Sequence, residues 1–233
     1  MAVLRSLVYA AIFYPMTLLW VIAGLTFALF SRRLTLAVVL SWVEINHWLV
    51  TRVLDIQIRV EGEVPAGAHL IAVKHQSMLE TLEMVRITNL PVIVIKKELA
   101  DLPLFGAMTR RYGVIPVERT AGAKALRALV ADGQAAVASG RDVIIYPEGT
   151  RVRVGETPEL RSGFAALYRA LGLPVVPVAV DSGVLWGRGL IHRPGTVTIK
   201  VGAAIPAGLK RAELEQRVHA AINVLELGAE ASA

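Results

Sequence analysis

The stretch HLIAVKHQSMLE, residues 69–80, decides the fold, because a continuous apolar run passes directly into a polar turn and a helix start. HLIAV does not alternate apolar with polar residues, which is typical of a strand covered on both faces in a largely parallel sheet. Ser77 and Glu80 have the S-x-x-E spacing of a capping box, so a helix is expected to begin at Ser77. The stretch therefore predicts a strand, a turn and a helix.

The same order of strands and helices continues through the rest of the chain. Further strand-like runs are IQIRVEG, PVIVI, GVIPV, DVIIYP, PVVPVAV and TVTIKVG. TVTIKVG alternates and is expected near an edge, and the proline inside PVVPVAV indicates an edge or a bulge. Helices are predicted over 77–89, 98–112, 122–139, 161–171 and 211–227. This order predicts an α/β fold with a largely parallel, twisted sheet that helices cover on both faces.

The N-terminal segment has a different character. No charged residue lies between Arg5 and Arg32, and this run is long enough to cross a hydrocarbon core as a helix. A cleaved signal peptide would have a shorter apolar region and a small-residue cleavage site, whereas this run ends in two arginines. We therefore expect a retained membrane anchor.

The next segment, residues 34–54, is apolar but contains polar residues and two tryptophans, which predicts a helix along the membrane surface or folded back as a hairpin. Glu44 and His47 share a helical face. We interpret them as a polar contact at the interface or between helices, because no substrate-like group accompanies them. The predicted organisation is an anchoring helix pair over 1–54 and a catalytic domain over 55–233.

Composition limits the partners and the location. Arginines are more frequent after the apolar run than before it, which favours the cytosolic face for residues 55–233. The absence of cysteine excludes disulfides and thiolate metal sites, and we expect no metal. The net charge of +6 suits anionic lipids or an acidic partner. Because the basic residues are dispersed and no binding motif accompanies them, no nucleic-acid partner is expected.

His75 and Glu80 are the first candidates for chemistry. On one regular helix, residues five apart point about 140° away from each other, so the two can meet only if His75 precedes the helix. A neutral histidine that holds a carboxylate on one ring nitrogen has the other nitrogen free as a general base. Alternatively, Glu80 only caps backbone amides. Both readings stay open here, and they are compatible.

Two further groups follow predicted strands. Glu148, Gly149, Thr150 and Arg151 come directly after DVIIYP, where a glycine turn, a hydroxyl and a guanidinium can hold a phosphate or carboxylate. An ordinary loop with a surface arginine is the alternative. Residues 96–119 bring more cations to the same edge, where parallel strands end. Signatures of serine hydrolases, P-loop enzymes and zinc proteases are missing from the sequence.

Taken together, these segments resemble the glycerolipid acyltransferase family, in particular its 1-acyl-sn-glycerol-3-phosphate acyltransferases. KHQSMLE resembles the family's H-x4-D box, KKEL…PLFG…GVIPVER its second block, YPEGTR its phosphate-site block and LPVVPVAV its fourth. The resemblance covers about Val60 to Ile205. The chain departs from the common pattern at Glu80, where most members have aspartate.

The resemblance implies transfer of an acyl group from acyl-carrier protein or acyl-CoA to the sn-2 hydroxyl of lysophosphatidic acid, at a membrane and without a cofactor. His75 would take the hydroxyl proton, and Glu80 would orient His75. The residues implied to hold or shape the acceptor phosphate site are Arg151, Arg119, Lys96, Thr150, Glu148 and Gly149. Another lysolipid acceptor such as a lyso-ornithine lipid, a non-catalytic lipid-binding protein and a thioesterase are the alternatives.

Overall fold

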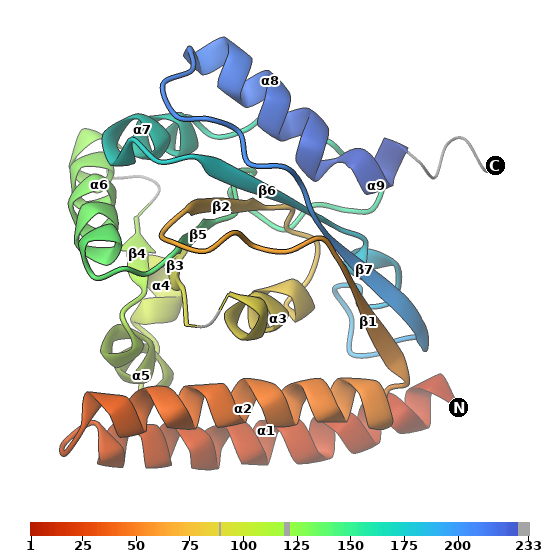
Figure 1. The fold of residues 1–233 in the computed structure, drawn as a ribbon. Coiled ribbons are helices and arrows are strands. Elements are labelled where there is room, and N and C mark those ends of the chain that lie inside the picture. Colours follow the sequence, from red (N-terminus) through yellow and green to blue (C-terminus); the bar gives the residue numbers. More distant parts are fainter. Residues whose placement is uncertain (89, 119–121, 228–233) are drawn as a thin grey trace.

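The computed structural model describes residues 1–88, 90–118 and 122–227, so Arg119 lies outside the described residues (Figure 1). Its sheet has the strand order β1-β7-β6-β2-β5-β3-β4. Neighbouring strands are parallel except for β6 and β7, which are antiparallel. The strands are β1 (Ile56–Glu61), β2 (Leu70–Val73), β3 (Val92–Lys96), β4 (Ile115–Val117), β5 (Val143–Ile145), β6 (Val175–Val180) and β7 (Gly195–Val201). The predicted largely parallel sheet is therefore confirmed.

The helices follow the predicted segments with local differences. They are α1 (Ala2–Phe27), α2 (Arg32–Arg52), α3 (Leu79–Ile87), α4 (Lys97–Ala100), α5 (Phe105–Tyr112), α6 (Gly122–Ala138), α7 (Ser162–Leu171), the 3-10 turn η1 (Ser182–Val184), α8 (Arg211–Ile222) and α9 (Val224–Leu227). The helix predicted over 98–112 is broken into α4 and α5. Pro103 lies in the break, and Leu104 adopts a positive φ of 59° that no helix tolerates.

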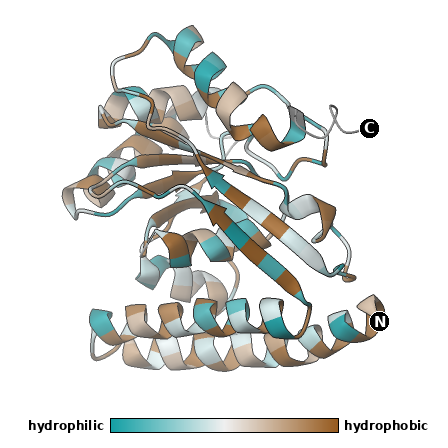
Figure 2. Ribbon diagram, turned by 45° about the vertical axis from the view of Figure 1, so that its right-hand side comes forward, coloured by the Kyte–Doolittle hydropathy of each residue, from teal (hydrophilic) through white to brown (hydrophobic). Residues whose placement is uncertain are grey.

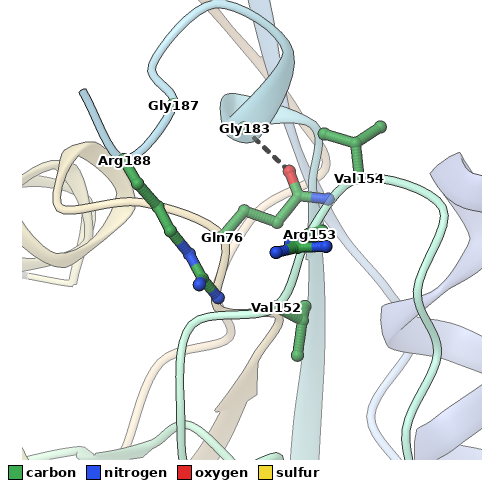
Figure 3. Close-up of a pocket in the computed structure, with 7 residues that line it drawn as sticks. All are labelled: Gln76, Val152, Arg153, Val154, Gly183, Gly187 and Arg188. Carbon is green, nitrogen blue, oxygen red and sulfur yellow. Dashed lines mark hydrogen bonds between the residues drawn. The ribbon is translucent and has the colours of Figure 1, made fainter.

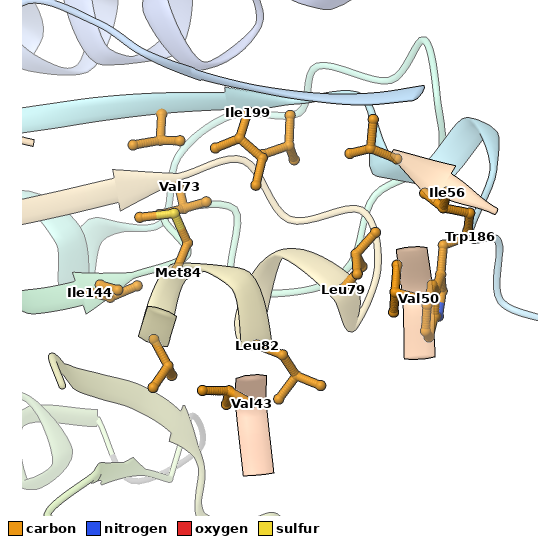
Figure 4. Packing of buried hydrophobic residues seen from close by; sticks show 14 of the residues in the cluster. Val43, Val50, Ile56, Val73, Leu79, Leu82, Met84, Ile144, Trp186 and Ile199 are labelled. Carbon is orange, nitrogen blue, oxygen red and sulfur yellow. The ribbon is translucent and has the colours of Figure 1, made fainter. Parts of the chain in front are cut away.

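Two apolar clusters cover the two faces of the sheet. On one face, α3 and α2 pack against the strands through residues such as Leu82, Met84 and Val50, as Figure 4 shows. On the other face, α6, α7 and α8 contribute Leu129, Phe164 and Leu214. Strand β2 serves both clusters, which explains why HLIAV has no polar alternation.

The strand β6 corrects one expectation. Because β6 pairs with both β2 and β7, Pro177 is not on an edge strand. Residues 178–180 of β6 pair with β7, and the next bridge joins Val175 to Ile205. Between these pairings, residues 176–177 of β6 therefore lie opposite residues 202–204 of the chain that follows β7. Of the two predictions for this proline, the bulge therefore agrees with the unequal number of residues in the β6–β7 pairing. At a bulge the missing N–H of proline is tolerated. TVTIKVG forms β7, next to the edge strand β1.

Helices α1 and α2 lie side by side beneath the α3 face (Figure 1). Hydrogen bonds join them at Trp42 Nε1 to Thr17 Oγ1 (3.0 Å) and at Tyr9 Oη to Asn46 Oδ1 (2.8 Å). Both are long and apolar enough to cross a membrane, and only 28% of the most apolar window of each is buried. The hydropathy colouring in Figure 2 shows apolar residues along this pair. The two helices therefore indicate membrane association.

Candidate active site

The turn after β2 continues the alternation of the strand, and this decides where each side chain points. Val73 packs in the cluster that contains α3, whereas Ala72 packs in the cluster that contains α8. After the strand, Lys74 reaches Asn223 at the end of α8, and His75 reaches Glu80 in α3. His75 therefore faces the side of the sheet edge on which α1 and α2 lie.

His75 and Glu80 form a direct pair. His75 Nδ1 lies 2.9 Å from Glu80 Oε1, and the carboxylate is 1% exposed. Within the described part of the chain, Nε2 of His75 makes no hydrogen bond, and 19% of the side chain is exposed. The ring of Tyr146 stacks on the imidazole, with centroids 4.1 Å apart and planes at 30°. The imidazole is thus fixed on one nitrogen and one face, and its other nitrogen is available for proton transfer.

The Glu80 carboxylate is saturated with donors. Its Oε1 accepts the backbone N–H groups of Gln76 (2.8 Å) and Ser77 (2.7 Å), and its Oε2 accepts the hydroxyls of Ser77 and Ser182, each at 2.6 Å. Burial alone would raise the pKa of Glu80, but His75 and the two hydroxyls hold it below its ordinary value. The carboxylate is therefore ionised, as is needed to stabilise a protonated imidazole.

The capping prediction is confirmed in part. Glu80 accepts the N–H of Ser77 as a capping box requires, but α3 begins at Leu79, and Ser77 Oγ accepts the N–H of Leu79 (3.0 Å) rather than that of Glu80. Met78 is the N-cap residue and makes no side-chain capping bond. Glu80 thus organises the backbone of the turn and holds His75 at the same time, so the two readings of this motif coexist.

A buried ion pair supports the same turn from the opposite face. Lys74 is fully buried, and its Nζ lies 3.0 Å from Glu148 Oε1. Glu148 Oε2 accepts the backbone N–H of His75 (2.9 Å). Burial raises the pKa of Glu148, and the Lys74 charge opposes this shift. Glu148 therefore positions the backbone of the histidine turn.

The other predicted phosphate-site residues lie on loops at the same sheet edge. Thr150 and Arg151 are exposed after β5, and Lys96 ends β3 with Nζ 3.8 Å from Glu98 Oε1. Gly149 has a φ of 72°, and a Cβ there would lie 2.9 Å from Arg161 Cγ, so the turn requires glycine. No direct contact joins Lys96 to Arg151 among the interactions of the described residues.

Three contacts of the site escaped sequence reasoning. The position of Lys74 could have indicated its buried ion pair, since a lysine directly after a fully buried strand needs a partner. No sequence pattern indicates the contacts of Ser182 and Tyr146. Both residues follow other strands, and the strand order of the sheet brings them to Glu80 and His75. His47 contacts both carboxylate oxygens of Glu83 at 3.1 Å, which confirms its interpretation as a contact between helices.

Comparison with known proteins agrees with this geometry. Residues 56–181 match the Acyltransferase family. The 1-acyl-sn-glycerol-3-phosphate acyltransferase of Pseudomonas aeruginosa is 34% identical over 78% of this chain and 74% of its own length. The human 1-acyl-sn-glycerol-3-phosphate acyltransferase beta is 30% identical over 62% of this chain and 54% of its own. The chain thus spans about three quarters of the first relative and about half of the second.

Two other similarities bear on acceptor and fold. The lyso-ornithine lipid O-acyltransferase of Pseudomonas aeruginosa is 25% identical over 79% of each chain. The crystal structure of the 1-acyl-sn-glycerophosphate acyltransferase PlsC from Thermotoga maritima superposes with a TM-score of 0.80, at 17% identity, over 99% of this chain and 98% of that one. This likeness includes the N-terminal helix pair as well as the sheet. From the match over 56–181 and the Pseudomonas relative, the chain belongs to the acyltransferase family.

Proposed function

We propose that the protein is a 1-acyl-sn-glycerol-3-phosphate acyltransferase, which transfers an acyl group to the sn-2 hydroxyl of lysophosphatidic acid and produces phosphatidic acid. The observation that carries the proposal is the His75–Glu80 pair, whose Nε2 makes no hydrogen bond to any described residue and lies on the side of the sheet edge that faces the apolar helix pair. The names of the Pseudomonas and human relatives support the same acceptor.

The reaction follows from this pair. The sn-2 hydroxyl donates a hydrogen bond to His75 Nε2, and its oxygen attacks the thioester carbonyl carbon while the proton moves to the imidazole. The ionised Glu80 stabilises the imidazolium through Nδ1. When the tetrahedral intermediate collapses, the carbon–sulfur bond breaks and the imidazolium returns its proton to the departing thiolate. Direct transfer between two bound reactants requires neither a covalent acyl-enzyme nor a cofactor.

We assign binding of the acceptor phosphate to the cationic side chains at the sheet edge that carries His75. Arg151 follows β5, which is the neighbour of β2, and Lys96 ends β3, the next strand. Both side chains are exposed and can be recruited by an anion. Arg119, with Thr150 and the Gly149 turn, completes the proposed phosphate site, while Glu148 supports the turn that carries His75.

The membrane arrangement is part of the proposal. Helices α1 and α2, within residues 1–54, hold the catalytic domain of residues 55–233 against the cytosolic face of the bilayer. The acceptor and the product are lipids, and His75 faces the side on which the helix pair lies, so a lysolipid can reach it without leaving the interface. The acyl donor, acyl-carrier protein or acyl-CoA, comes from the aqueous side.

Acyl transfer by the purified full-length protein in detergent micelles tests this function. Parent, His75→Ala and Glu80→Asp are compared with lysophosphatidic acid and with a lyso-ornithine lipid as acceptors, and with each donor. We expect phosphatidic acid from the parent, none from His75→Ala, and reduced but measurable product from Glu80→Asp. Faster acylation of the lyso-ornithine lipid would reassign the acceptor. Release of free fatty acid without an acceptor would indicate a thioesterase.

A further inference from the structure

A loop connects the apolar helix α1 to the turn that carries His75. Residues 181–194 lie between β6 and β7 and include the 3-10 turn η1. Near its beginning, this 181–194 loop bonds Glu80 of the histidine pair, and further along it packs on α1. The loop therefore contacts both the helix pair and the candidate active site.

The beginning of the 181–194 loop holds the catalytic turn at two points. Ser182 Oγ donates to Glu80 Oε2 at 2.6 Å, and the N–H of Gly183 donates to Gln76 Oε1 at 2.9 Å. The second bond is the dashed line in Figure 3. A Cβ at Gly183 would lie 3.1 Å from Gln76 Cβ, so the loop and the turn are in close contact. A displacement of the loop therefore disturbs the carboxylate that orients His75.

The same loop also reaches the segment that follows β5. Arg188 donates to the carbonyl oxygen of Arg151 at 2.8 Å. Figure 3 shows Arg188 next to Gln76 and to the residues that follow Arg151. The 181–194 loop thus contacts the backbone of the proposed phosphate site as well as the histidine turn.

Hydrogen bonds within the loop tie Ser182 to Trp186. The N–H of Trp186 donates to the carbonyl oxygen of Ser182 at 2.8 Å, and the N–H of Leu185 donates to the same oxygen at 3.2 Å. The N–H of Arg193 donates to the Leu185 carbonyl oxygen at 2.9 Å, which joins the two arms of the loop. Because Ser182 and Trp186 lie on one short hydrogen-bonded turn, a shift of the indole also shifts the hydroxyl on Glu80.

Aromatic contacts seat Trp186 on α1. The buried indole stacks on His192, with ring centroids 4.0 Å apart and planes at 23°. Tyr9 of α1 meets both rings edge-on, at centroid distances of 5.4 Å from Trp186 and 5.9 Å from His192. Edge-to-face aromatic pairs are attractive in a specific geometry. Tyr9 therefore determines where the two rings of the loop lie.

A hydrogen bond from the backbone fixes the loop along α1. The N–H of His192 donates to Ser6 Oγ at 2.9 Å. Ser6 is buried and lies three residues before Tyr9, on the same helical face. Loss of this hydroxyl would leave a buried N–H without its acceptor, which is costly. Packing and a directed bond thus attach the loop to the first turns of α1.

Resting on the proposed function, we propose that Tyr9 and Ser6 are positioning residues for the histidine pair, because they seat the loop that holds Ser182 against Glu80. Helix α1 is then part of the active-site scaffold as well as a helix that indicates membrane association. The contacts run without a gap from Tyr9 to Trp186, from Trp186 to Ser182 and from Ser182 to Glu80. Their loss acts on the alignment of the catalytic base, so it changes kcat rather than substrate binding.

Steady-state kinetics of the full-length protein in micelles, with lysophosphatidic acid as acceptor, test this role. Tyr9→Leu is expected to lower kcat about fivefold, since two edge-to-face contacts are lost, and to leave both KM values within about twofold. Tyr9→Phe keeps both ring contacts and loses only the hydrogen bond to Asn46, so it should retain at least about half of the kcat. Tyr14→Leu, on the exposed face of the same helix, is the matched control and should resemble the parent.

A double-mutant cycle with Ser182→Ala determines whether the effect passes through Glu80. Once the Ser182 hydroxyl is absent, Tyr9→Leu is expected to lower kcat by no more than about a further twofold. An equal factor in both backgrounds would show that Tyr9 and Ser182 act independently and would overturn the proposal. Equal losses of kcat in Tyr9→Leu and Tyr14→Leu, or in Tyr9→Leu and Tyr9→Phe, would overturn it as well.

Backbone hydrogen exchange gives a readout that needs no turnover. The N–H groups of Gly183 and Ser77 are expected to exchange at least about tenfold faster in Tyr9→Leu, while those of α6 exchange as in the parent. Ser6→Ala, which removes only the acceptor of the His192 N–H, is the second variant if Tyr9→Leu does not fold. Unchanged exchange at Gly183 in the folded variants would overturn the proposal. A parent that acylates no lysophosphatidic acid, with exchange that still depends on Tyr9, would instead refute the proposed function.

Discussion

The hydroxyl of Ser182 lies 2.6 Å from Oε2 of Glu80, although 102 residues separate the two along the chain. Ser182 follows β6, and Glu80 belongs to the helix that follows β2. Because β6 and β2 are adjacent parallel strands, their ends bring the two side chains together. Ser182 is fully buried, so its hydrogen bond is not shared with bulk water. The carboxylate of the histidine pair is therefore oriented by a residue from a distant part of the sequence.

Replacing Ser182 by alanine is expected to lower kcat about tenfold, the effect of one lost hydrogen bond to a charged group. Since this bond lowers the pKa of Glu80, its loss raises that pKa, and the acid side of the kcat profile moves to higher pH. Ser139→Ala is the control, because it removes a hydroxyl that bonds the Ala136 carbonyl at the end of α6, away from the histidine pair. An equal loss of kcat at every pH would show that Ser182 is merely structural.

The stability of the protein at acid pH depends on Glu80. Its pKa in the folded protein is below the ordinary value of 4.5, so the unfolded chain binds the proton more tightly. The stabilisation is complete above pH 4.5 and is lost as the pH falls through the folded-state pKa. Denaturant unfolding of parent and Glu80→Gln in micelles measures this. We expect the difference in unfolding free energy between the two to shrink as the pH falls below 4.5.

Lys74→Met is expected to destabilise the fold by about 3–5 kcal/mol, because it leaves the buried Glu148 carboxylate without its charge partner. The double variant Lys74→Met/Glu148→Gln should recover part of this loss, since no unpaired charge stays buried. Lys96→Met, on a lysine that is half-exposed, should change the unfolding free energy by no more than about 0.5 kcal/mol. Equal effects of the two lysine substitutions would contradict a structural role for the buried pair.

The exposed apolar surface of α1, which indicates membrane association, can be tested directly. Leu18 and Leu19 of α1 are 52% and 61% exposed. Leu18→Lys/Leu19→Lys places two charges where hydrocarbon is expected, at about 2.5–3.5 kcal/mol each near the bilayer centre and less near the interface. In vesicle flotation we expect the variant to bind at least tenfold more weakly. Leu126→Lys, on exposed α6, should float like the parent.

Much of the fold could be predicted because its causes are local. Runs such as HLIAV and DVIIYP lie where the sheet is covered on both faces, so burial removes the polar alternation that an edge strand shows. The break between α4 and α5 was missed, although Pro103 signals it, because the flanking residues favour a helix.

The site was predictable only in its sequence-local part. His75 and Glu80 are five residues apart, and the S-x-x-E spacing places one before the helix and the other within it. Ser182 and Tyr146 reach the same pair through strand order, which no local pattern encodes. Glu148 was assigned to a phosphate site from its neighbours, but its carboxylate turns inward to Lys74 because an unpaired lysine cannot stay buried.

The contacts of Asn223 and Glu226 with Lys74 and Gln76 also impose an order on biosynthesis. Chains fold from the N-terminus as they are made, so α1 and α2 can enter the lipid while most of the sheet is still to be translated. The turn that carries His75 obtains two of its supports only after α8 and α9 have been synthesised. The helix pair that indicates membrane association is therefore synthesised before the turn that carries His75 has all its supports.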